Sequence, residues 1–122
     1  MRGLRDFHEV FGYVAIVANG LAGVVALVAW WARRLRGRWI WAVTIVAEAM
    51  MMVEVVIGVA LLSGDRYEAT RFHMFYGFLA FLTVGLAYQY RDAMRGRTEL
   101  LYGLVGLFLM GLGIRAVFEV GA

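Results

Sequence analysis

The stretch VFGYVAIVANGLAGVVALVAWWA, residues 10–32, determines the fold class of this chain because it carries no charged residue along its whole length. At about 1.5 Å per helical residue, such a run can cross roughly 30 Å of hydrocarbon. Three more apolar segments follow, at residues 39–62, 72–90 and about 100–120. The sequence therefore predicts an all-α, integral-membrane four-helix bundle.

The composition agrees with a membrane protein. Of the 122 residues, 63% are hydrophobic, whereas about half are apolar in a soluble domain. We expect a single transmembrane domain, 1–122, with helices at about 8–33, 39–62, 71–91 and 98–120. The chain has no proline and no cysteine, which predicts unkinked helices and excludes thiolate metal ligands, iron-sulfur clusters, covalent c-type haem and disulfides.

Arginines are concentrated in two of the connections between helices. The first connection carries Arg33, Arg34, Arg36 and Arg38, and the third carries Arg91, Arg95 and Arg97. By the positive-inside rule both connections face the cytoplasm. The second connection, SGDRYEAT, balances its arginine with Asp65 and Glu68. We therefore expect a multi-pass protein of the bacterial cytoplasmic membrane with both termini outside, and the arginines imply no nucleic-acid partner.

An internal repeat relates the first and third apolar segments. An offset of 65 positions superimposes identical residues, namely Phe7 on Phe72, His8 on His73, Gly12 on Gly77, Ala15 on Ala80, and the triplet Gly20-Leu21-Ala22 on Gly85-Leu86-Ala87. The chain is therefore predicted to consist of two tandem two-helix hairpins. Since a hairpin crosses the membrane twice, both copies enter it in the same direction, and a pseudo-two-fold axis should lie along the membrane normal.

His8 and His73 are the only histidines in the chain. Two imidazoles from equivalent helices can bind one iron from opposite sides, so both are candidate axial ligands of haem b. Gly12 and Gly77, one turn further along each helix, would leave room for the porphyrin. The alternative is that each histidine lies at the polar interface and that its repetition only records the duplication.

Charged residues inside the apolar segments are costly and are usually paired or functional. Counting from the loops places Glu54 and Arg115 within about 3 Å of each other in depth, so we expect an ion pair. The pair would hold the second and fourth helices in register, or Arg115 would bind a haem propionate and Glu54 would accept a proton near a quinone. Glu48 is a proton-path candidate, or a neutral carboxyl hydrogen-bonded to Thr44 or to a neighbouring helix.

Four antiparallel spans with histidines on the first and third, each followed by a glycine one turn away, resemble the haem-bearing core of membrane b-type cytochromes. Those cytochromes generally place two histidines on each ligand-bearing helix and hold two haems, so the resemblance implies at most one haem for His8 and His73. The segment ELLYGLVGLFLMGLGIRA, residues 99–116, also looks like small uncharacterised four-helix membrane proteins of high-GC bacteria, and that resemblance implies no function.

Three functions are compatible with the sequence. The first is a small haem b-binding electron-transfer protein or subunit with bis-histidine ligation near the outer face. The second is a non-catalytic accessory subunit that packs against other membrane subunits, or against a second copy, through glycine-rich faces. The third is a metal- or proton-coupled carrier that uses Glu48, Glu54 and the histidines. The histidines are level in the membrane only if the first helix projects about 9 Å further into the cytoplasm than the third.

Overall fold

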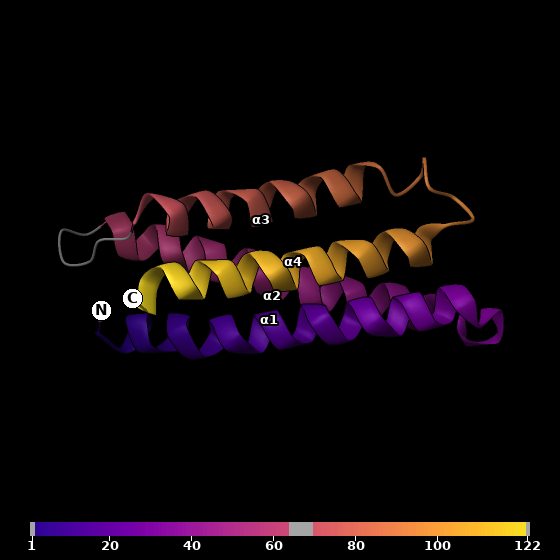
Figure 1. Cartoon of the computed structure of the whole chain (residues 1–122), viewed down its shortest axis with the longest axis horizontal. Coiled ribbons are helices and arrows are strands. Elements are labelled where there is room, and N and C mark those ends of the chain that lie inside the picture. The colour runs from indigo at the N-terminus through magenta and orange to yellow at the C-terminus, as the bar shows by residue number, and fades with distance from the viewer. Residues whose placement is uncertain (1, 64–69, 122) are drawn as a thin grey trace.

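The computed structural model of this chain describes residues 2–63 and 70–121, and of residues 2 and 119–121 it describes only the backbone. This part of the chain forms four α-helices and contains no strand, which confirms the all-α bundle (Figure 1). The helices are α1 (Arg2–Trp31), α2 (Arg38–Ser63), α3 (Arg71–Gln89) and α4 (Thr98–Gly121). A short 3-10 helix, η1 (Arg33–Leu35), lies between α1 and α2.

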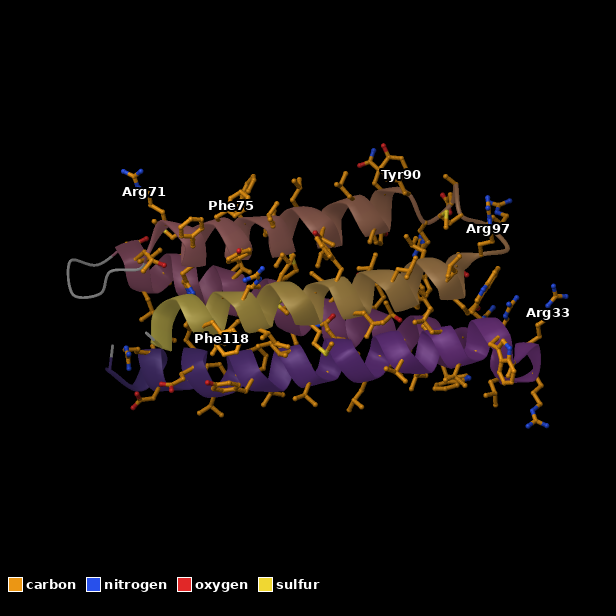
Figure 2. All side chains as sticks on the ribbon, in the orientation of Figure 1. Arg33, Arg71, Phe75, Tyr90, Arg97 and Phe118 are labelled. Carbon is orange, nitrogen blue, oxygen red and sulfur yellow. The ribbon has the colours of Figure 1, made fainter. Side chains whose placement is uncertain are left out.

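The helices alternate in direction, so that α1 and α3 run one way and α2 and α4 run the other (Figure 1). Both ends of the chain lie at one end of the bundle, and η1 and the α3–α4 connection lie at the opposite end. Arg33 and Arg97 mark this opposite end (Figure 2), which we call the arginine end. Asp65 and Glu68, expected to balance the charge at the other end, lie outside the described residues.

The first helix is longer than expected, because α1 begins at Arg2 rather than at residue 8. No proline interrupts residues 2–8, and Arg5 and Glu9, one turn apart, are 4.0 Å from each other, which suits a helix. At the other end, the Arg36 guanidinium donates to the carbonyl oxygens of Ala29 at 3.0 Å and Trp30 at 2.6 Å. These two oxygens belong to the last turn of α1, where carbonyls have no partner within the helix.

Three helices in the described part of the chain are long and apolar enough to cross a membrane, namely those over residues 3–31, 38–63 and 98–118. The third helix, α3, was expected to be a fourth span but is not among them. Its 19 residues reach about 28 Å, and they include polar residues such as His73, Thr83 and Gln89. Large apolar side chains cover the outside of the bundle on every helix, as expected of helices surrounded by lipid.

The helices form a ring in which α1 and α3 lie on opposite sides, and the backbones of these two helices do not pack against each other in the described part of the chain. The closest packing is between α1 and α4, and the loosest neighbouring pair is α2 and α3. Glycines explain the close pair. A Cβ atom at Gly106 of α4 would lie 2.7 Å from the Asn19 carbonyl oxygen and 2.8 Å from the Gly23 Cα atom. Small residues thus let α1 and α4 approach backbone to backbone.

The face of α1 that carries Ala15 and Asn19 points into the bundle. Ala15 is fully buried, and Asn19, one turn further, is 1% exposed. The Asn19 side-chain amide donates to the carbonyl oxygens of Ala15 at 2.8 Å and Ala47 at 2.9 Å. Because Ala47 belongs to α2, the hydrogen bond from Asn19 fixes the register of α1 against α2.

Candidate functional site

The two histidines meet inside the bundle although the backbones of α1 and α3 do not pack against each other. The imidazole ring centroids of His8 and His73 are 6.4 Å apart, and the ring planes are inclined by 79°. The two rings are therefore nearly level. Figure 1 shows why, because α1 extends further than α3 toward the arginine end.

His8 lies against Glu54 of α2. Its Nδ1 atom is 3.1 Å from Oε2 of Glu54, and the side chains are 21% and 12% exposed. The distance is that of an ion pair, but the angle does not fit a hydrogen bond, and Nδ1 is buried without a hydrogen-bond partner. The second carboxylate oxygen of Glu54, Oε1, is also buried and has no hydrogen-bond partner among the described residues. Buried polar atoms usually have a hydrogen-bond partner, so these two atoms stand out in this part of the bundle.

Two glycines make this contact between α1 and α2 sterically possible. A Cβ atom at Gly12 would lie 2.6 Å from Oε2 of Glu54, and a Cβ atom at Gly58 would lie 3.1 Å from Cε1 of His8. Each helix therefore contributes one polar side chain and, four residues later, one glycine that accommodates the partner's side chain. We call these four residues, His8, Gly12, Glu54 and Gly58, the reciprocal set.

His73 is held differently, by the backbone of α4. Its Nδ1 atom is 2.8 Å from the carbonyl oxygen of Ala116. A carbonyl oxygen only accepts hydrogen bonds, so Nδ1 carries the proton, and Nε2 of the neutral ring is left with a free lone pair. The backbone N–H of His73 donates to the Thr70 hydroxyl oxygen at 3.1 Å. Thr70 thus caps α3 and fixes the turn that carries the histidine.

The expected ion pair between Glu54 and Arg115 is wrong. Glu54 faces His8 instead. Arg115 is exposed on α4, and no carboxylate of the described side chains lies within 4.0 Å of it. Counting residues gave the depth correctly, since Arg115 adjoins Ala116 at the level of the histidines. The direction was missed because α4 turns the neighbouring residue, Ala116, toward His73 and Arg115 outward.

Glu48 is buried in α2 at 6% exposure. The expected hydrogen bond between Glu48 and Thr44 is not formed, because the Thr44 hydroxyl oxygen is buried without a hydrogen-bond partner in the described part of the chain. Thr44 and Glu48 are four residues apart and lie on the same face of α2. Both side chains point into the bundle interior, where they do not meet. Glu48 and Glu54 are separated by six positions, about 9 Å along α2.

The glycines of the two copies also differ. The space beside Gly12 is taken by the Glu54 carboxylate, whereas a Cβ atom at Gly77 would meet nothing within 4 Å. The two glycines therefore differ in whether a side chain of a neighbouring helix occupies the position of an added Cβ atom.

Two parts of this site were missed by sequence reasoning. Gly58 was not singled out, although the spacing of Glu54 and Gly58 equals that of His8 and Gly12 and could have revealed the reciprocal set. The Ala116 carbonyl has no sequence signal, because every residue offers one.

Within residues 2–63 and 70–118, no group of three or more histidine, aspartate or glutamate side chains is arranged to hold a metal ion. Comparisons of the chain with protein-family models, with curated proteins and with solved structures find no match.

Proposed function

We propose that this protein is a small integral-membrane electron-transfer protein that binds one haem b through His8 and His73. One observation carries the proposal, namely that both imidazoles converge while each Nδ1 atom faces an oxygen acceptor, Glu54 for His8 and the Ala116 carbonyl for His73. Histidines that bind metals typically direct their second ring nitrogen to a carboxylate or a backbone carbonyl. The hydrogen bond to Ala116 leaves the Nε2 atom of His73 to act as a ligand, and the Nε2 atom of His8, which lies beside Gly58, would be the second ligand.

The separation of the rings supports axial ligation of a single iron. A bond between a metal and an imidazole nitrogen is about 2.0 Å, and a ring nitrogen is about 1.1 Å from its ring centroid. Two imidazoles on opposite sides of one metal would thus have centroids roughly 6 Å apart. The centroids of His8 and His73 are 6.4 Å apart. A porphyrin supplies four nitrogens, so the two histidines would complete the coordination.

When bound, haem would supply one-electron transfer, and the chain would tune it. Glu54 would place a carboxylate beside His8, which favours the oxidised form because it adds negative charge near the iron. Arg115 remains the candidate partner of a haem propionate because of its depth, next to Ala116 at the level of His73, and such a propionate would have to reach the outer surface of α4, where Arg115 is exposed. Glu54 also remains the candidate proton acceptor near a quinone.

We place the protein in the bacterial cytoplasmic membrane with both termini outside. The grouping of η1 and the α3–α4 connection at the arginine end supports this orientation, because arginine-rich connections stay in the cytoplasm. Reporter fusions at Arg36 and Arg95 should report the cytoplasm, and a fusion at the C-terminus should report the outside. A cytoplasmic C-terminus would refute the orientation.

The visible spectrum of the purified protein tests the haem proposal. Reduced-minus-oxidised bands of a low-spin haem are expected, in protein as isolated or after addition of haemin. His8→Ala and His73→Ala should each abolish the low-spin spectrum, because both axial bonds are needed for six-coordination. A wild-type protein that is folded, yet shows no such bands after haemin addition, would refute the proposal.

A second candidate function is that of an accessory subunit, which packs against other subunits of a larger membrane complex or against a second copy of this chain. It is favoured by Gly85 and Gly111, which are exposed on α3 and α4 and have nothing within 4 Å of an added Cβ atom. Exposed glycines suit close packing against a further helix. Large subunits that co-purify with a haem-free protein would favour this candidate over the first.

A further inference from the structure

A hollow of about 490 Å³ opens at the arginine end of the bundle. It lies between the first turn of α2, the α3–α4 connection and the first turn of α4, and three arginines line it, Arg38, Arg91 and Arg95. The hollow is far from the histidines, which lie near the opposite end of the bundle, so what it binds is independent of the haem proposal.

The arginines at this end of the bundle differ in whether the molecule itself engages them. Arg36 is engaged by the molecule itself, because it caps α1, lies 4.7 Å from the Trp30 ring centroid and is 3.9 Å from Glu99. The three arginines of the hollow have no carboxylate within 4.0 Å among the described side chains. Topology alone requires arginines at this end, but it does not require three unpaired ones around one hollow.

The remaining lining suits a phosphate at a membrane interface. Trp41 and Tyr102 contribute aromatic surface, and the Arg91 guanidinium lies 5.7 Å from the Trp41 ring centroid. Thr98 begins α4 and also lines the hollow, so backbone N–H groups without partners in the helix are close by. Asp92 is the one acidic residue of the lining, and it leaves the hollow with a net positive charge.

The apolar lining of a neighbouring hollow favours a lipid over a free anion as the ligand. This second hollow, of about 350 Å³, lies between α3 and α4 at the same end and is lined mostly by apolar side chains, among them Leu86, Leu101 and Val105. Both hollows border the same α3–α4 connection. Cationic and apolar surfaces side by side match a molecule that has a charged headgroup and acyl chains.

We propose that the arginine hollow binds the phosphodiester headgroup of an anionic phospholipid in the adjacent leaflet. The guanidinium groups of Arg38, Arg91 and Arg95 donate charge-assisted hydrogen bonds to the phosphate oxygens. Basic pockets between membrane helices on the cytoplasmic side are suited to such headgroups.

Native mass spectrometry of the full chain in detergent, titrated with dioleoyl phosphatidylglycerol or dioleoyl phosphatidylcholine, tests the proposal. One phosphatidylglycerol should bind at least about tenfold more tightly than phosphatidylcholine. Combined replacement R38Q, R91Q and R95Q should weaken phosphatidylglycerol binding by about tenfold or more. The matched control R33Q, R34Q and R97Q removes the same charge at the same end, outside the hollow, and should change the affinity less than about twofold.

Equal losses in the two triple variants, or equal binding of the two lipids by the wild type, would refute the proposal. Inorganic phosphate is the third ligand arm, and displacement of phosphatidylglycerol by phosphate at similar concentrations would identify a free anion as the ligand instead. If the hollow variant does not fold, Asp92→Asn gives an independent result. Removing this carboxylate should tighten phosphatidylglycerol binding severalfold, and unchanged or weaker binding would contradict the proposal.

Discussion

The two copies of the repeat, α1 and α3, carry glycines at equivalent positions but use them differently. In α1, a Cβ atom at Gly12 or Gly20 would lie 2.6 Å from a side chain of a neighbouring helix. In α3, Gly77 and Gly85 have nothing within 4 Å of an added Cβ atom. The same residue is therefore a packing requirement in one copy and not in the other. A duplicated glycine keeps its role only where the facing helix supplies a side chain that needs the space.

The histidines show the opposite behaviour, because both point into the same region of the bundle. What differs is the group that holds each ring. His8 depends on a side chain, Glu54, whereas His73 depends on the backbone of α4. The α1 copy should therefore be sensitive to side-chain substitutions to which the α3 copy is indifferent.

The largest loss of stability is expected from a substitution that breaks the close packing of α1 on α4. Gly106→Leu should destabilise the bundle by about 3 kcal/mol or more, because its Cβ atom would overlap the backbone of α1 near Asn19 and Gly23. Gly85→Leu, in α3, should change the stability by less than about 0.5 kcal/mol. Unfolding in mixed micelles of increasing denaturing-detergent content measures both. Similar losses would show that the two interfaces are equally close-packed.

An intermediate effect, on haem affinity, is expected to distinguish Gly12 from Gly77, the glycines one turn from the histidines. Gly12→Ala should displace the Glu54 carboxylate from His8 and lower haem affinity by about tenfold or more. Thermal stability should hardly change, because the Glu54 carboxylate ends a flexible side chain and can move. Gly77→Ala should change neither quantity. Haemin titration followed by absorbance measures the affinity, and equal effects of the two substitutions would contradict the asymmetry between the copies.

The smallest loss of stability is expected from a substitution that gives α1 the residue found at the equivalent position of α3. Position 19 is asparagine in α1, and the equivalent position in α3 is Val84. Asn19→Val should cost about 0.6–1.7 kcal/mol, because it removes the hydrogen bond to Ala47 of α2. The control Thr83→Val also replaces a polar residue by valine, in α3, but Thr83 makes no hydrogen bond in the described part of the chain. A larger loss for Thr83→Val would reverse the comparison.

The architecture could be predicted from the sequence because it follows from length and charge. Long uncharged segments predict helices, and arginines in two connections place those connections at the same end. The repeat placed His8 and His73 on parallel helices near the same end of the bundle, and whether the two rings face each other was left open. These inferences need only the order of residues along the chain.

The partners of the buried charges could not be predicted in the same way. Counting residues gives the depth of a side chain, but the direction in which it points depends on which helix face is buried. An amphipathic helix shows that face as an apolar stripe, whereas α2 and α4 are apolar on all sides. Arg115 was therefore placed at the correct depth and assigned to the wrong face, and the partner of Glu54 was expected in α4 although it lies in α1.

The reciprocal set offers a criterion for finding relatives of this protein in genomes. A histidine four residues before a glycine in the first apolar segment, and a glutamate four residues before a glycine in the second, together form a compact search pattern. Inserting one residue between positions 54 and 58 would rotate Gly58 by about 100°, so insertions inside either half should be rejected by selection. Position 116 contributes only its backbone carbonyl to His73, so relatives should carry various helix-forming residues there.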